Sequence, residues 1–177
     1  MGYGKAIERR EDKGRRLTSV KDSVRTLAIC RKINKTLTQK QKVVVLIKLL
    51  ELVGSDRNLT GQRMEIINTV AEVFNISQEE YHLIKTFALH EPGDQADHSD
   101  LLLASAAGAH DTGEHTKALH VDIHGELLFL LVRSVDMYFV RYHGEQEIML
   151  NGFAVKPRAV NQFSHGSTIK MPSGDAL

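Results

Sequence analysis

The segment from residue 38 to residue 89 constrains the fold most, because it contains three consecutive amphipathic helices with short connections. Apolar residues recur every three or four positions in each helix, and a Ser or Thr that can cap the N-terminus precedes each one. The expected N-caps are Thr38, Thr60 and Ser77. Helices of this length are marginal alone and bury their apolar stripes only against each other, so the segment predicts a compact helical module.

Two of these N-caps are expected to form capping boxes, in which a Gln or Glu three residues later bonds back to the amide of the cap. The pairs are Thr38 with Gln41 and Ser77 with Glu80. Gly54 is expected near the end of the first of the three helices, because glycine accepts the left-handed conformation found there.

A further helix is expected to begin at Ser19, with Asp22 in the same kind of pair. Its apolar residues follow at spacings of three and four: Val20, Val24, Leu27, Cys30, Ile33 and Leu37. This stripe predicts docking against the other three helices to form a four-helix unit. Since Cys30 lies on the stripe, we expect a buried, unreactive thiol rather than a nucleophile.

The chain changes character after a polar linker at residues 91–99 that contains Pro92 and Gly93. Short apolar or alternating runs separated by Gly and Asn turns predict strands at residues 117–123, 126–132, 135–142, 147–150, 158–163 and 168–171. Asn151-Gly152 predicts a tight hairpin turn. The predicted fold class is α+β, a helical unit followed by a small antiparallel β-sandwich or barrel. The expected divisions are a mobile basic tail (1–16), a helical domain (17–90), the linker (91–99) and a β-rich module (100–177).

The helix, acidic loop and helix that lead into F-N-I-S-Q-E-E-Y at residues 74–81 resemble the tellurite-resistance TerB-like helical family. In that family the loop is similar to A-D-G-x-I-S-x-x-E, which implies a metal site. Here Asp56 matches the Asp and is the candidate metal ligand, whereas Arg57 replaces the Gly and Arg63 stands where the family has an acid. Two guanidinium groups oppose a hard cation, so we expect no tight divalent metal and no other cofactor.

The β-rich module resembles the forkhead-associated (FHA) β-sandwich. The resemblance rests on I-M-L-N-G at residues 148–152 and on G-S-T-I at residues 166–169. The phosphothreonine pocket of that family needs an upstream Gly-Arg and a Ser-x-x-His, which are missing before Asn151. Since Arg133 and Arg141 alone do not make a phosphate-binding cluster, we expect a sandwich without phosphopeptide binding. The two modules in this order resemble the front of certain large bacterial ABC-transporter-type proteins, which implies a transport ATPase as partner.

Charge is divided unevenly along the chain, although the net charge is only +1. Residues 1–42 carry 13 Lys and Arg against 4 Asp and Glu, a net charge of +9, and the remainder carries −8. A protein partner is expected to be steered by this division. Contact of residues 1–35 with anionic lipid or nucleic acid is the alternative. The chain has one Cys and no apolar run of membrane-spanning length, which predicts a cytoplasmic location. A position at the inner face of the membrane is the alternative.

Motifs for catalysis are missing from the sequence. There is no G-x-x-x-x-G-K-[ST] phosphate loop, and Gly166-Ser167 lacks the rest of a nucleophile elbow. Four of the nine His, at positions 110, 115, 120 and 124, lie close together without a zinc-ligand spacing. We therefore expect a non-enzymatic regulatory or protein-interaction module tied to a membrane transport or stress-response system. The alternative is a metal-responsive binding module that retains part of the acidic loop.

Overall fold

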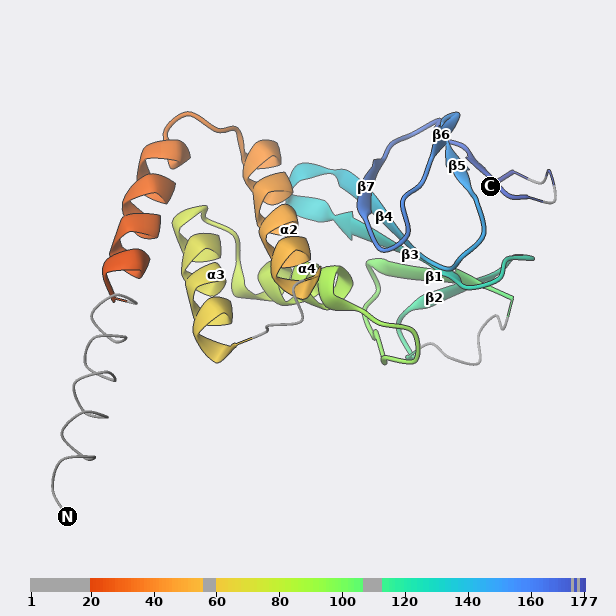
Figure 1. Ribbon diagram of the computed structural model, residues 1–177, viewed down its shortest axis with the longest axis horizontal. Coiled ribbons are helices and arrows are strands. Elements are labelled where there is room, and N and C mark those ends of the chain that lie inside the picture. Colours follow the sequence, from red (N-terminus) through yellow and green to blue (C-terminus); the bar gives the residue numbers. More distant parts are fainter. Residues whose placement is uncertain (1–19, 56–59, 107–112, 173, 175) are drawn as a thin grey trace, which may run out of the picture.

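The helices precede the strands in the chain, which confirms the α+β class (Figure 1). The computed structural model describes residues 20–55, 60–106, 113–172, 174 and 176–177. The helices are a first helix at residues 20–34, α2 (Gln39–Ser55), α3 (Gly61–Val73) and α4 (Gln78–Leu89). The strands are β1 (Leu101–Ser105), β2 (Lys117–His120), β3 (Glu126–Val132), β4 (Met137–His143), β5 (Met149–Leu150), β6 (Phe153–Ala154), β7 (Val160–Phe163) and β8 (Ile169–Lys170), with a short 3-10 turn η2 (Arg133–Val135) between β3 and β4.

The strands form a five-stranded sheet in the order β2-β1-β3-β4-β7 and a three-stranded sheet in the order β6-β5-β8. All pairs are antiparallel except β1 with β2, so the expectation of a purely antiparallel module is wrong for that pair. The strand β3 has the predicted bounds, and Asn151 and Gly152 both have positive φ at the predicted β5–β6 turn. The strand β1 was not predicted, because a short continuous apolar run does not by itself distinguish a strand from a buried helical segment.

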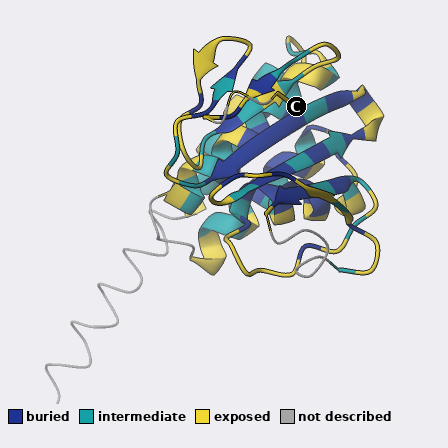
Figure 2. Ribbon diagram, turned by 90° about the vertical axis from the view of Figure 1, so that its right-hand side faces the viewer, coloured by how far each residue is buried: buried dark blue, intermediate teal, exposed yellow. Residues whose placement is uncertain are grey.

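The central strands β1, β3 and β4 of the larger sheet are mainly buried and include the dark blue strands in Figure 2, whereas the edge strand β2 is mostly exposed. Alternate residues of β1, β3 and β4 face α2 and α4 and share one core with them. The opposite residues pack under the smaller sheet around Tyr142. Next to the smaller sheet, on the same face of the larger sheet, Phe129, Tyr138 and Phe163 line an apolar pocket of about 400 Å³. The helical and β-rich parts therefore share a core, and the division at residues 91–99 stays a prediction.

The local helix signals are confirmed in part. Gly54 lies near the end of α2 as predicted, but it is inside the helix and has no positive φ, so the left-handed conformation predicted there is wrong. Ser19, the predicted first residue of the first helix, lies outside the described residues. The Thr38 amide donates to Gln41 Oε1 at 2.9 Å, and the Gln41 amide donates to Thr38 Oγ1 at 3.3 Å, which completes the predicted capping box. Ser77 Oγ accepts from the Glu80 amide at 3.2 Å. The Glu80 carboxylate instead accepts from the amide of Ser134 in η2, at 3.4 Å, so the returning half of this box is wrong. A contact with the sheet has replaced a local bond there.

The first helix packs by only the second half of the predicted apolar stripe. Cys30 is buried in the main core, and Leu27, Ile33 and Leu37 are partly buried. Val20 and Val24 are 60% and 62% exposed, so the predicted stripe is wrong in its first half. These two residues lie roughly 80° and 120° around the helix axis from Cys30, at about 100° per residue.

The outer edge of β7 is covered by α2 through side chains. Glu51 Oε1 accepts from the Val160 amide at 2.7 Å, and Lys48 Nζ donates to the Val160 carbonyl at 3.0 Å. Lys48 and Glu51 also pair with each other at 2.7 Å. Because an open strand edge invites pairing with other chains, these bonds protect the sheet at β7 and fix α2 against it.

Candidate binding surfaces

The predicted metal loop lies partly outside the described residues. Asp56 and Arg57 lie outside the described residues. Arg63 lies in the first turn of α3, where its amide donates to Thr60 Oγ1 at 3.3 Å. Across residues 20–55, 60–106 and 113–172, no group of three or more His, Cys, Asp or Glu side chains is arranged to hold a metal ion.

The candidate His cluster is dispersed over the surface. His110 lies outside the described residues, and His120 and His124 are exposed. His115 bonds through its ring Nδ1 to Asp97 Oδ2 at 3.1 Å, and its amide donates to Asp97 Oδ1 at 2.6 Å. These bonds lower the pKa of the Asp97 carboxyl. The pair closes a surface loop. Within the described residues, no third His, Cys, Asp or Glu side chain lies near enough to this pair to complete a metal site.

Cys30 is buried, as predicted, and burial raises the pKa of its thiol. A raised pKa lowers the fraction of thiolate, which is the nucleophilic form. The position therefore serves packing between the first helix and the core.

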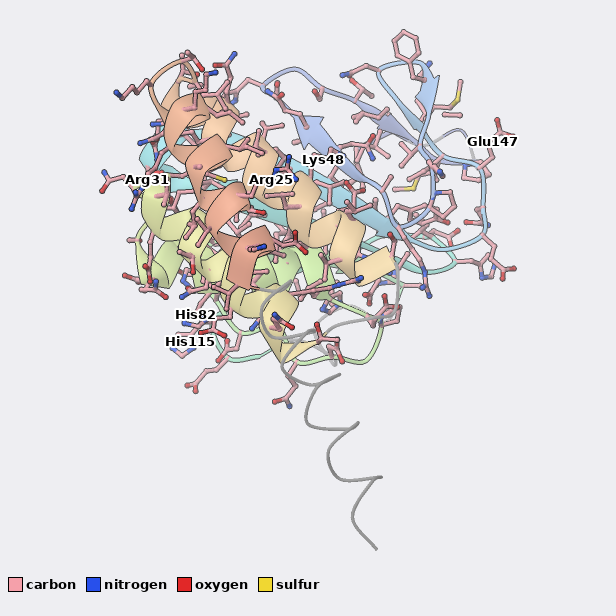
Figure 3. All side chains as sticks on the ribbon, turned by 60° about the vertical axis from the view of Figure 1, so that its left-hand side comes forward. Arg25, Arg31, Lys48, His82, His115 and Glu147 are labelled. Carbon is pink, nitrogen blue, oxygen red and sulfur yellow. The ribbon has the colours of Figure 1, made fainter. Side chains whose placement is uncertain are left out.

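The solvent side of the first helix presents a continuous set of cations, which we call the basic face. It consists of Lys21, Arg25, Arg31, Lys32 and Lys35. All five are exposed, and Figure 3 shows this helix in front of the molecule with Arg25 and Arg31 labelled. None of them forms an ion pair within the described residues, and Val20 and Val24 lie exposed among them. The face therefore offers positive charge beside a small apolar area.

A second set of charged and polar groups is buried where α4 meets the larger sheet. His90 follows α4, and its Nε2 bonds to Glu126 Oε1 at 2.7 Å. The rings of His90 and His143 meet edge to face with centroids 5.7 Å apart. Arg141 Nη1 donates to the His90 carbonyl at 2.7 Å, from the same face of β4 as His143. This cluster joins the end of the helical layer to β3 and β4.

His143 is expected to make the stability of the protein depend on pH. Its side chain is 4% exposed, and neither ring nitrogen has a hydrogen-bond partner in the described residues. Burial, followed by repulsion from Arg141, lowers the pKa of His143 to about 4, although Glu126 and Glu91 oppose the shift and His90 adds to it. In the unfolded chain the pKa is about 6.5, so between pH 6.5 and 4 the unfolded state binds a proton that the folded state does not.

The contribution of neutral His143 is therefore complete above pH 6.5 and is lost as the pH falls towards 4, by up to about 3 kcal/mol. Urea unfolding at pH 7.5, 6.0, 5.0 and 4.5 measures this loss. The variant His143→Gln should show a flatter dependence than the unmodified chain, whereas His120→Gln, at an exposed position, should not. Equal slopes for the unmodified chain and His143→Gln would contradict the assignment.

Sequence reasoning missed this buried cluster, because its members are separated by up to 53 residues, from His90 to His143, and carry no motif. The one available signal was a cation inside the otherwise apolar run of β4 at Arg141. None of the described helices has the length and apolar character needed to cross a bilayer. No protein-family model matches the chain, and no curated protein or solved structure matches it.

Proposed function

We propose that this protein is a non-enzymatic protein-interaction module of a larger membrane-transport or stress-response assembly, and that its partner presents an acidic surface. The observation that carries the proposal is the basic face, five exposed cations without an ion-pair partner in the described residues. The assignment to transport or stress response is supported by the TerB-like and FHA-like resemblances of the sequence, with a transport ATPase as the expected partner.

The arrangement of the basic face costs helix stability. Lys21 and Arg25 are like charges four residues apart in the helix, and such a pair destabilises a helix by about 0.2–0.5 kcal/mol. No described acidic side chain compensates for them by an ion pair. An acidic partner would relieve this repulsion, and Val20 and Val24 would add apolar contact at the same surface.

A protein partner fits the basic face better than a membrane or a nucleic acid does. Helices that bind membranes insert a broad apolar face with large residues such as Trp, Phe and Leu, whereas the exposed apolar residues here are Val20, Val24 and Ile29, and Ile29 lies on another side of the helix. Single-stranded nucleic acid needs aromatic side chains for stacking, and residues 20–35 contain none.

Deletion of Met1 to Arg16 is expected to leave recognition of the protein partner intact, because residues 20–35 carry the basic face. The measurement is affinity capture of the full chain and the shortened chain after cross-linking in cells, followed by quantitative mass spectrometry. The same protein should be recovered by both, and recovery should fall as salt rises because exposed charges are screened.

The competing partners are separated in the same experiment. Anionic vesicles and duplex DNA are added as competitors and should not displace the captured protein. If the deletion abolishes capture, and vesicles or DNA compete for the full chain, the tail binds lipid or nucleic acid and the proposal fails. Hydrolysis of nucleotide by the purified chain would also contradict a non-enzymatic role.

A further inference from the structure

A cleft of about 940 Å³ opens between the C-terminal part of α2, the end of α4 and the loop before β7. Figure 3 labels Lys48, one of the α2 residues in its wall. Its charged lining residues are Lys48, Glu51, Glu91, Arg141, Lys156 and Arg158. The cleft lies where the helices α2 and α4 meet the β4 and β7 side of the larger sheet. None of its lining residues belongs to the basic face, so binding in the cleft is independent of the proposed function.

Arg141 lies at the inner wall of the cleft with its side chain only 8% exposed. Its Nε donates to the Arg158 carbonyl at 2.9 Å and its Nη1 donates to the His90 carbonyl at 2.7 Å. Its Nη2 makes no hydrogen bond within the described residues, and the nearest carboxylate oxygen, Glu91 Oε1, is 3.9 Å away. Burial lowers the pKa of Arg141, as expected for a cation without close neutralisation. An unsatisfied guanidinium edge therefore borders the cleft.

Arg158 is held beside Arg141 by an unusual backbone conformation. Its φ is 65°, in the left-handed region that a non-glycine residue seldom adopts. Two bonds to β4 fix it there, because the Arg158 amide donates to the Tyr142 carbonyl at 2.7 Å and the Arg158 carbonyl accepts from Arg141. Strained backbone of this kind is often found at binding sites.

The Glu91 carboxylate lies between the two guanidinium groups. Its Oε2 is 3.2 Å from Arg158 Nη2, and its other oxygen faces Arg141. Lys48 pairs with Glu51, and Lys156 is exposed without an ion pair in the described residues. Once these pairs are accounted for, three cations face one carboxylate, which leaves a surplus of two positive charges.

Much of the remaining wall of the cleft is apolar. Leu52 is 66% exposed, and Ala88, Leu89, Pro157 and Ala159 also line the cleft, together with Gly54 and Ser55. A ligand that matches both parts needs a multivalent anionic group and a small apolar body. Arg clusters bind phosphate oxygens by short charge-assisted hydrogen bonds, and ligand sites combine such polar groups with apolar walls.

We propose that this cleft binds a phosphate monoester with a small apolar substituent. The phosphate oxygens accept from Arg141 Nη2, from the Arg158 guanidinium and from Lys156. The substituent packs against Leu52 and Pro157. In the free protein the Glu91 carboxylate lies beside the two guanidinium groups that would bind the phosphate. The phosphate must displace it, so Glu91 weakens binding.

Isothermal titration with phenyl phosphate tests this site, with inorganic phosphate and benzoate as the two partial ligands. Phenyl phosphate should bind more tightly than either, because only it supplies both the dianion and the apolar body. The variant Arg158→Asn should lower the affinity at least about tenfold, since a charge-assisted hydrogen bond is lost. Asn tolerates positive φ, so this variant keeps the backbone. The variant Glu91→Gln should raise the affinity about threefold to tenfold.

Lys170→Gln, at an exposed position on β8, is the matched control for loss of one cation and should bind as the unmodified chain does. Vesicles containing phosphatidic acid distinguish a lipid source from a free ester, and in either case Arg158→Asn must weaken the binding at least about tenfold. Retained affinity in Arg158→Asn, with circular dichroism showing a folded chain, would overturn the site. Equal affinity for benzoate and phenyl phosphate would overturn the ligand class, and a binding isotherm unchanged in Glu91→Gln would overturn the competing role of Glu91.

Discussion

Replacement of Gly125 by Ala is expected to lower the free energy of unfolding by about 3 kcal/mol or more. A Cβ at this position would lie 2.0 Å from the His143 carbonyl oxygen and 2.8 Å from the Gly144 Cα. Both are backbone atoms of the neighbouring strand end, so no side-chain rotation relieves the clash. Gly125 also has a φ of 111°, which an L-amino acid rarely adopts. The turn before β3 therefore requires glycine for both space and conformation.

Gly152→Ala is the matched control for this prediction. Gly152 has a φ of 84°, but a Cβ there would meet no atom within 4 Å. The free energy of unfolding of this variant should fall by only about 1 kcal/mol, the cost of placing Ala at a positive φ. Urea unfolding of the two variants measures the difference. Similar losses of stability would show that the 124–125 turn can move away from β4.

Replacement of Arg141 by Met is expected to lower the free energy of unfolding by about 3–4 kcal/mol. Met keeps most of the packing volume of the aliphatic stem but leaves the His90 and Arg158 carbonyls without their donors. It also leaves the Arg158 backbone, at positive φ, with one fewer bond to β4. The loss is large because these bonds join the end of α4, β4 and the loop before β7.

Arg133→Met provides the comparison for the loss of an arginine in an ion pair. Arg133 is bidentate to Asp100, but its side chain is mostly exposed. The side chain of Asp100 is only 8% exposed, so this variant leaves a largely desolvated carboxylate without its partner and should lower the free energy of unfolding by about 1–2 kcal/mol, less than Arg141→Met does. Thermal and urea unfolding of both variants give the comparison. If Arg141→Met were as stable as Arg133→Met, the buried cluster would not be what joins the helices to the sheet.

Features that depend on near neighbours in the sequence were predicted well. The capping box of Thr38 with Gln41, the N-cap Thr60 and the hairpin turn at Asn151-Gly152 all depend on residues at most three positions apart. The strand β3 was predicted with its observed bounds because six consecutive apolar residues follow Glu126 and the His124-Gly125 turn precedes them.

Features that depend on tertiary contacts were predicted poorly. The Glu80 carboxylate accepts from the amide of Ser134 instead of making the expected capping bond. Val20 and Val24 are exposed, although their spacing predicted contact with the other helices. The cleft around Arg141 could not be predicted from the sequence, because Glu91, Arg141 and Arg158 come from different parts of the chain and meet only after the sheet forms. Burial and distance, rather than residue type, distinguish them from other charged residues.

The most direct test of the interaction function is reversal of charge on the basic face. The double variant Lys21→Glu with Arg25→Glu replaces the positive pair by a negative pair at the same spacing and changes the net charge by four. Lys40→Glu with Lys170→Glu makes the same change at exposed positions away from that face. The measured quantity is recovery of the cross-linked protein partner from cells. Recovery should fall at least about tenfold for the first variant and remain unchanged for the second. Equal recovery with both variants would contradict recognition through the basic face.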